Sequence, residues 1–220
     1  MELFEQFLQQ YRVKKFAKGE VIICEGEQPP CAYAIKSGVV KTYSLTAEGQ
    51  EKPISFDLAG EVFPVGWVFG KQSHAQYFYE AFSDCAVYCV PRDEFIAYVQ
   101  KQPELLWEFV GFMVTHYLNF QMRVNALEQS RAADKILQTL HFLSVRFGQE
   151  IKDNTVKIKL PMTQQDMANY MGLTRETTGI ELKKLERRGI IKYVHQEYVI
   201  YTDKLNELLD EEYEDGRIIE

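Results

Sequence analysis

Cysteine and histidine, the residues that most often hold metals or build disulfide frameworks, are scarce in this sequence. Four cysteines and four histidines occur among 220 residues, with no C-x-x-C and no H-x-H spacing. The cysteines are Cys24, Cys31, Cys85 and Cys89. Such sparse cysteines exclude a disulfide scaffold, and we expect buried free thiols. We predict no metal site and no cofactor, because too few ligands are available.

A long apolar run is also missing. No segment approaches the roughly 20 apolar residues that span a bilayer, and the N-terminal MELFEQFLQQYR lacks the basic start and apolar core of a signal peptide. We therefore expect a cytoplasmic protein with no membrane partner. The hydrophobic content of 46% in 220 residues is enough for the core of one large or two small domains.

The chain as a whole has no excess of positive charge, since its formal charge is -7. One part of the chain nevertheless has such an excess. Residues 1–130 contain 11 Lys and Arg against 16 Asp and Glu, residues 131–203 contain 12 against 9, and residues 204–220 contain 2 against 7. Attraction to phosphate is local and is screened beyond about 10 Å. The basic segment can therefore bind DNA although the whole chain is acidic.

The segment from Thr163 to Gly189 has the pattern of two helices joined by a tight turn. Thr163 and Asp166 have the spacing of a helix start, in which hydroxyl and carboxylate bind otherwise unpaired backbone amides. Gly172 can take the left-handed conformation that ends a helix, and Thr174 can cap the next one. This is the layout of a DNA-reading helix-turn-helix.

The second of these helices is expected to face DNA. Arginine can donate to two acceptors of guanine, a carboxylate can accept from the cytosine amino group, and threonine hydroxyls suit phosphates. Arg175 and Glu176 in the first turn are the best candidates for base readout. The predicted DNA-binding residues are Thr163, Thr174, Arg175, Glu176, Thr177, Thr178, Lys183, Lys184 and Arg188.

A run such as KKLERR is, by itself, more often the solvated face of an ordinary amphipathic helix. The capping residues, the turn and a following strand pair favour the DNA-binding interpretation here. Residues Ile190–Val194 and Tyr198–Thr202 alternate as two strands joined by His195, Gln196 and Glu197. They would form a wing beside the helices.

The first half of the chain alternates short apolar runs with turn residues between Val13 and about Pro91. The predicted turns contain Gly19, Gly26, Gly38, Gly49 and Gly60. This spacing predicts an antiparallel β-roll or barrel.

A long helix is predicted from Pro103 to Gln129. Its apolar residues recur at intervals of four and three, which is a heptad seam. The seam consists of Leu106, Val110, Met113, Tyr117, Phe120, Val124 and Leu127. A packed core helix would show the same stripe, but a long helix with large side chains in a narrow seam favours a parallel homodimer. Ser130 then indicates a break before a further helix, Ala132–Phe147.

A barrel, a long dimer helix and a winged helix-turn-helix, in this order, resemble the Crp/Fnr family of bacterial transcription regulators, which includes the cyclic-AMP receptor protein. The most specific similarities are ILQTL at Ile136–Leu140, TRETTG at Thr174–Gly179, IKSGVVKTY at Ile35–Tyr43 and the Ala59-Gly60-Glu61 turn. The resemblance implies an α+β fold with a cyclic-nucleotide-binding-like jelly roll over residues 1–102 and a dimerisation helix over 103–130. A winged helix-turn-helix over 131–203 and an acidic tail over 204–220 would follow. It also implies a homodimer that binds a pseudo-palindromic operator in double-stranded DNA, with RNA polymerase as a further partner.

The chain departs from cyclic-AMP-binding members of this family at the ligand-binding residues. Where those members have a ribose-binding glutamate and a phosphate-binding Arg-Ser pair, this chain has Val65 and Ala75-Gln76. A buried phosphate without a cation would be strongly unfavourable, so we expect a small effector other than cyclic AMP.

Aromatic residues replace the phosphate-binding segment and suit an apolar or aromatic effector. The predicted effector residues are Trp67, Phe69, Gln76, Tyr77 and Tyr79, together with His116 and Asn119 on the long helix. The alternative is that the aromatic side chains only fill the core, and the sequence does not decide between the two.

Other classes of protein fit the sequence less well. A cupin-like β-roll enzyme would need a metal site, for which the barrel offers only His74, expected to be solvated, and a cyclic-nucleotide-binding signalling protein would need the missing arginine. The family's oxygen sensors use closely spaced N-terminal cysteines, whereas Cys24 and Cys31 lie within predicted strands. We therefore expect a regulator that is not an enzyme. Ile180 replaces the second arginine of the family's reading helix, which predicts an unusual half-site.

Overall fold

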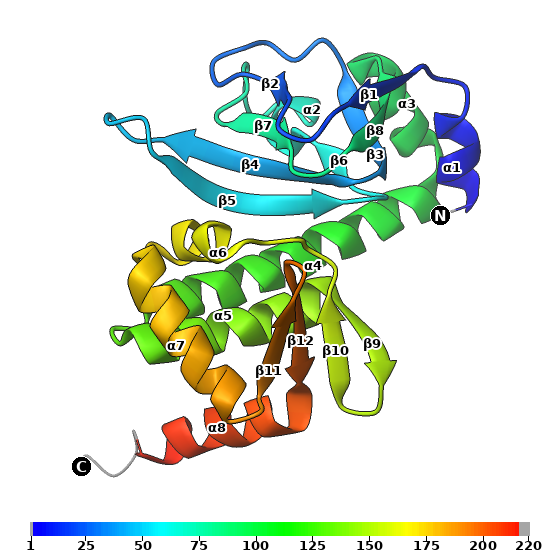
Figure 1. Cartoon of the computed structure of the whole chain (residues 1–220). Helices are drawn as coiled ribbons and strands as arrows, with labels where there is room; N and C mark the ends of the chain where they lie inside the picture. The colour runs from blue at the N-terminus through cyan, green and yellow to red at the C-terminus, as the bar shows by residue number, and fades with distance from the viewer. Residues whose placement is uncertain (1, 216–220) are drawn as a thin grey trace. The chain divides into compact units, whose positions relative to one another are not determined.

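A computed structural model describes the backbone of residues 2–215 and the side chains of residues 4–210. The chain divides into two compact units, Met1–Met113 and Val114–Glu220, called here the N-terminal and C-terminal units (Figure 1). The long helix α4 (Pro103–Glu128) contributes residues to both. No helix in the described part of the chain is long and apolar enough to cross a membrane.

The N-terminal unit contains two four-stranded antiparallel sheets, as the spacing of turns predicts. One sheet has the order β1-β8-β3-β6 and the other the order β2-β7-β4-β5. The strands are β1 (Val13–Phe16), β2 (Val21–Ile23), β3 (Ala32–Ser37), β4 (Val39–Leu45), β5 (Glu51–Leu58), β6 (Val62–Phe63), β7 (Phe78–Ala81) and β8 (Cys85–Val90). Except for the consecutive strands β4 and β5, neighbouring strands in these sheets come from distant parts of the sequence.

The turn between β3 and β4 depends on glycine. Gly38 has a φ of 93°, and a Cβ at this position would overlap the carbonyl oxygen of Asp84. A side chain here would meet backbone that cannot move aside, in a conformation that L-residues rarely adopt. The other four predicted turn glycines also have positive φ angles, which confirms the predicted turns.

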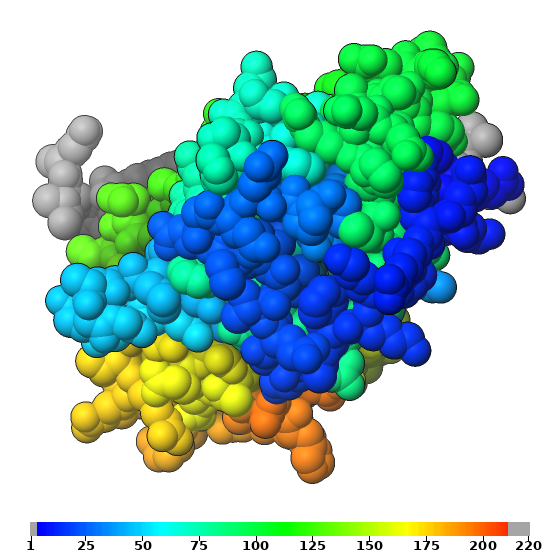
Figure 2. All heavy atoms as spheres, turned by 90° about the horizontal axis from the view of Figure 1, so that it is seen from above, coloured from blue at the N-terminus to red at the C-terminus, as the bar shows by residue number. Residues whose placement is uncertain are grey.

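Four helices pack on the first sheet: α1 (Glu2–Leu8), α2 (Val65–Val68), α3 (Arg92–Lys101) and the start of α4. Figure 2 shows the dark-blue N-terminal residues beside the green residues of α3. At this contact the rings of Phe7 and Tyr98 stack with centroids 3.8 Å apart. A second core cluster contains Phe63 and Tyr79, whose rings stack at 5.3 Å.

The C-terminal unit combines helices with a four-stranded antiparallel sheet of order β11-β12-β10-β9. Its helices are α5 (Ala132–Phe147), α6 (Gln164–Met171), α7 (Arg175–Arg187) and α8 (Thr202–Asp215). Its strands are β9 (Gly148–Lys152), β10 (Thr155–Ile158), β11 (Ile191–Val194) and β12 (Glu197–Tyr201). Sequence reasoning missed β9 and β10, because every residue of β9 is exposed and no apolar alternation marks it.

Two expectations for this unit are wrong in detail. The wing hairpin turns on two residues, His195 and Gln196, both with positive φ, and Glu197 pairs with Val194 as part of β12. This is the two-residue turn that matches the twist of paired strands. The segment expected as an acidic tail from residue 204 instead continues as α8, because Leu205, Leu208 and Leu209 form an apolar face that is buried. Residues 216–220 lie outside the described residues.

The expectation of buried free thiols is wrong for three of the four cysteines. Cys31 and Cys89 form a disulfide with a Cα–Cα distance of 5.5 Å, Cys24 is an exposed free thiol, and only Cys85 is a buried free thiol. Neither Cys24 nor Cys31 lies within a strand; Cys24 follows β2 and Cys31 precedes β3. The pairing of β3 with β8 brings together cysteines 58 residues apart, which spacing along the chain could not reveal.

Candidate DNA-binding site

The first helix of the predicted reader begins at the expected capping residues. The Thr163 hydroxyl oxygen accepts a hydrogen bond from the backbone amide of Asp166 at 3.1 Å, and the Thr163 amide donates to the Asp166 carboxylate at 2.8 Å. This reciprocal pair satisfies backbone donors that a helix start leaves unpaired. It confirms the predicted start of α6.

The turn between α6 and α7 depends on Gly172 and Thr174. Gly172 has φ 67° and ψ 31°, the left-handed conformation expected at the end of a helix, and no atom lies within 4 Å of the place where a Cβ would be. The Thr174 hydroxyl then accepts from the Thr177 amide at 3.1 Å and caps α7. The two caps fix where α7 starts, and hence the direction in which its first turn points.

Helix α7 lies along one edge of the C-terminal unit (Figure 1). Its inner face is held by Thr178 and Leu182, which are buried. Arg175 and Glu176 are exposed in the first turn. Partly free backbone amides and the helix dipole make this end attractive to phosphate oxygens.

Two predicted DNA-binding residues are placed where they cannot contact DNA as expected. Thr178 is fully buried on the inner face, because it lies one turn before Leu182. Thr163 donates both its amide proton and its hydroxyl proton to Asp166, at 2.8 and 2.7 Å. A phosphate offers only acceptors, so Thr163 acts as a cap.

Thr177 is better suited to a phosphate contact. Its hydroxyl accepts a hydrogen bond from the Thr174 hydroxyl at 2.9 Å, which leaves the Thr177 proton able to donate. Thr174 is exposed and Thr177 is half-buried at the start of α7.

Ile180 and Arg187 also lie on the outer face of α7. Positions 176, 180, 183 and 187 follow the i, i+4, i+7, i+11 spacing of one helix face. Ile180 is 50% exposed on this face, between Glu176 and Lys183, and Arg187 is exposed at its far end. The missing arginine at position 180 is therefore replaced by an apolar side chain that faces solvent.

The other cations of α7 lie toward the side of the helix. Lys184 and Arg188 line a groove of about 400 Å³ together with Arg187 and with apolar side chains of α5 and α8. The Lys184 ammonium is paired with Glu181 at 2.7 Å. This placement suits contacts with backbone phosphates beside the reading face better than contacts with bases.

The C-terminal half of α4 is connected to α6 by a cation–π contact. The guanidinium of Arg123 lies 3.5 Å from the centroid of the Tyr170 ring, and Tyr170 is 3% exposed. Burial lowers the pKa of Arg123, but an arginine remains charged at physiological pH. Such a contact is worth about 2 kcal/mol when desolvated. Sequence reasoning missed it, because an arginine in a long helix looks like a surface residue.

The predicted seam of α4 is an exposed apolar stripe in the single chain. Leu127 is half-buried, and the other six residues are exposed by 39% to 61%. Three further apolar residues of α4, Trp107, Val114 and Leu118, are exposed by 76%, 52% and 53%. The exposed apolar surface of α4 is thus broader than a seam with two residues in each heptad. An apolar patch of this kind marks an interaction surface.

Comparison with known proteins identifies the two units. Residues 13–102 match the model of a cyclic nucleotide-binding domain, and residues 131–210 match that of a Crp-like helix-turn-helix domain. Electron transport regulator A of Shewanella oneidensis is 30% identical over 192 residues, which cover 87% of this chain and 75% of that protein. The chain belongs to the Crp/Fnr family of DNA-binding transcription regulators.

A further sequence relative and two solved structures of similar fold are also found. The fumarate and nitrate reduction regulatory protein of Escherichia coli is 28% identical over 180 residues, covering 82% of this chain and 71% of that protein. A solved CooA variant from Carboxydothermus hydrogenoformans has a TM-score of 0.74 at 20% identity, covering 92% of this chain and 89% of the other. A CRP/FNR-family regulator from Thermus thermophilus has a TM-score of 0.68 at 24% identity, covering 90% and 98%.

The aromatic effector candidates of the N-terminal unit of this Crp/Fnr chain belong to two different core clusters. Trp67 and Phe69 belong to the core beneath α1 and α3, whereas Tyr77 and Tyr79 belong to the other core cluster. Gln76 is exposed. These four aromatic side chains pack in or against the two cores, and their role as an effector site remains a prediction.

The two remaining effector candidates lie on the part of α4 that belongs to the C-terminal unit. His116 has its Nε2 3.4 Å from a guanidinium nitrogen of Arg146 on α5, and Asn119 is half-buried. None of the seven predicted effector residues lines the groove beside α7. None lines the small cavity between α1 and α4 either. His74, by contrast, is exposed as expected, with its Nδ1 3.0 Å from the Ser73 hydroxyl.

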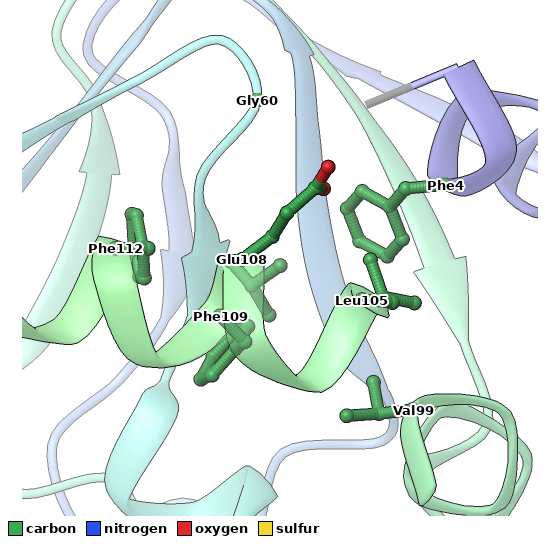
Figure 3. A pocket seen from close by; sticks show the side chains of 8 residues that line it. Phe4, Gly60, Val99, Leu105, Glu108, Phe109 and Phe112 are labelled. Atoms are coloured by element: carbon green, nitrogen blue, oxygen red, sulfur yellow. The ribbon is translucent and has the colours of Figure 1, made fainter. Parts of the chain in front are cut away.

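A cavity in the N-terminal unit lies where α1, α3 and α4 approach the turn before β6 (Figure 3). Its volume is about 90 Å³, and its lining is apolar except for Glu108. Figure 3 shows the Glu108 side chain extending from α4 toward the ring of Phe4. Cavities that enclose a nucleotide-sized ligand measure about 300 Å³ or more, so this one is too small for such a molecule.

The described residues also contain no cluster of three or more His, Cys, Asp or Glu side chains that could hold a metal ion. The cupin-like enzyme interpretation needs such a cluster.

Proposed function

We propose that this chain acts as a homodimer that binds a pseudo-palindromic operator, with the N-terminal half of α7 reading bases in the major groove. The observation that carries the proposal is the exposure of Arg175 and Glu176 on the first turn of a helix capped by Thr174. In this arrangement Arg175 would donate to a guanine and Glu176 would accept from a cytosine. Lys183, Lys184, Arg187 and Arg188 would neutralise phosphates along the groove.

Ile180 adds a second element of base readout. The half-exposed Ile180 side chain lies between the polar side chains of Glu176 and Lys183, and contact with water does not stabilise it. It can instead pack against the C5-methyl group of thymine. We therefore expect a thymine beside the guanine that Arg175 reads. This replaces the second guanine contact of relatives with an arginine at the equivalent position.

The homodimer would form along α4. The exposed stripe from Leu106 to Val124 would be buried against its copy, which removes apolar side chains from water. A parallel pair also places two reading helices on one side of the assembly, as two half-sites require. Domain limits of 1–102, 103–130 and 131–203 for sensor, dimer helix and reader remain part of this proposal.

The setting of the proposed regulator follows from its target. DNA binding places it in the cytoplasm, RNA polymerase is the partner through which a transcription regulator acts, and no enzymatic role is proposed. A small effector other than cyclic AMP remains the proposed signal, and the 90 Å³ cavity is too small to hold a nucleotide-sized molecule.

Selection of bound sequences from random double-stranded DNA tests the proposed function. We expect enrichment of two inverted half-sites whose centres lie about 10 base pairs apart, each with a guanine next to a thymine. Replacing that thymine by deoxyuridine, which lacks only the methyl group, should weaken binding by the wild type but not by Ile180→Ala. Enrichment of single, unpaired sites, or of no sequence at all, would reject the proposal.

Cyclic AMP is expected not to bind, even though residues 13–102 match a cyclic nucleotide-binding domain. Val65 is half-buried, Ala75 is 2% exposed, and the Ala75 backbone is bonded to Gly26 and Glu27 at 2.8 Å each. These positions offer no cation to a buried phosphate. Isothermal titration should show no saturable heat at sub-millimolar cyclic AMP, and operator affinity should not change on its addition. A micromolar dissociation constant would contradict this expectation.

A further inference from the structure

The disulfide between Cys31 and Cys89 has no place in the DNA-binding function described above. We propose that these two cysteines are a reversible thiol–disulfide pair through which the regulator senses the oxidation state of small thiols. The inference rests on the proposed function in one respect: a protein that binds DNA works in a compartment that keeps thiols reduced. In such compartments a cysteine pair within bonding distance is usually transient and redox-sensing, because structural disulfides do not persist there.

The geometry of the pair comes from the sheet. Tyr33 on β3 is the register partner of Cys89 on β8, and Cys31 lies just before β3, so the two Cα atoms are 5.5 Å apart. This separation lies within the range that a disulfide bridges without backbone movement. Reduction therefore leaves two thiols that are held close enough to reform the bond.

The other two cysteines differ from the pair in the properties that matter. The Cys85 thiol is buried and lies 3.1 Å from the carbonyl oxygens of Val39 and Ser83, and burial raises its pKa. A buried thiol of raised pKa is a poor nucleophile. Cys24 is exposed and provides a matched control: a free thiol on the same unit outside the pair.

Cys89 is the more exposed residue of the pair, being half-buried, whereas Cys31 is 2% exposed, so we assign the first attack to Cys89. The oxidant is a low-molecular-weight disulfide of the glutathione type. The Cys89 thiolate attacks one of its sulfurs, which forms a mixed disulfide and releases one small thiol. The Cys31 thiolate then attacks the Cys89 sulfur, which closes the Cys31–Cys89 bond and releases the second small thiol. Two electrons pass from the protein to the small disulfide, and the two protons of the cysteines end on the two released thiols.

The bond lies at the point where the roll leads toward the long helix. Val90, next to Cys89, is fully buried in the same core cluster as Phe95 and Leu105, at the starts of α3 and α4. Closing the bond ties this end of β8 to the segment before β3. The state of the pair therefore acts on the strand that leads through α3 into the proposed dimer helix.

The test equilibrates the full-length wild-type protein in buffers with graded ratios of reduced to oxidised glutathione. After acid quenching and alkylation, mass spectrometry counts the free thiols. Under oxidising ratios we expect two alkylated cysteines, Cys24 and Cys85, and a cross-linked Cys31–Cys89 peptide; under reducing ratios we expect four. The unfolding temperature should fall by roughly 5–15 °C on reduction, because the bond no longer restricts the unfolded chain.

Operator affinity is then measured in both states. We expect at least a fivefold difference for wild type and for Cys24→Ser, and no difference for Cys31→Ala/Cys89→Ala, which serves as a permanently reduced form. A bond that does not form under any ratio, or that does not open under reducing ratios, would overturn the redox pair. Equal operator affinity in both states would overturn the sensing role. Absence of operator binding in every state and variant would reject the proposed function instead, and the thiol count would still test the pair.

Discussion

Replacing both Tyr117 and Phe120 by glutamate is expected to convert the proposed homodimer into a monomer. Tyr117 and Phe120 are 61% and 58% exposed in the single chain, in the middle of the proposed seam. In a parallel dimer the new carboxylates would face their copies across a desolvated strip, where like charges without partners are strongly unfavourable. Operator affinity should fall by about 100-fold or more, because the two half-sites would no longer be bound by one linked molecule.

Light scattering and a fluorescence anisotropy titration measure these two effects, and circular dichroism checks that Tyr117→Glu/Phe120→Glu remains folded. Asn125→Glu is the matched control, since it adds a carboxylate to an exposed position of α4 outside the seam. The control should remain a dimer. A dimeric double variant would place the interface on another surface.

Removing the Arg175 side chain is expected to abolish one feature of the operator without abolishing DNA binding. A bidentate arginine–guanine contact discriminates against other bases by about 1–3 kcal/mol, so Arg175→Ala should weaken each half-site by roughly 5- to 150-fold. The preference for guanine at one position of each half-site should disappear from sequences selected by the variant. Binding to unrelated DNA should change much less.

Arg188→Ala is the control that separates base reading from phosphate anchoring. Arg188 lies at the C-terminal end of α7 and lines the groove beside α5 and α8. Its removal should weaken binding to all sequences alike and reduce the salt slope by about one for each phosphate that the variant no longer neutralises. If Arg175→Ala selects the wild-type motif unchanged, α7 is not the reading helix.

The elements that could be predicted are those whose signals are local. The cap at Thr163, the turn at Gly172 and the helix break after residue 128 depend on residues within one or two turns of each other. The same holds for the glycines between the strands of the roll, because a positive φ is a property of a single residue. The order of these signals was enough to indicate the family and its fold class.

The inner and outer faces of α7 show where local patterns become ambiguous. Thr178 looks like a surface threonine in the sequence, yet α7 buries it together with Leu182 against the rest of the unit. Strand β9 and helix α8 show the same limit: a strand with every residue exposed carries no alternation, and an acidic helix conceals the three leucines that anchor it. Burial depends on which face meets a neighbour, and this is set by packing of elements far apart in the chain.

Two contacts between distant residues show most clearly which features only the tertiary structure could reveal. Arg123 lies over the ring of Tyr170, 47 positions later, and Cys31 is bonded to Cys89, 58 positions later. Each residue alone has an ordinary sequence environment, and no periodicity links it to its partner. Helix and turn signals act over a few residues, so they determine the order and the type of the elements. Side-chain partners are chosen only when sheets pair and helices pack, because only then do distant residues come within bonding distance.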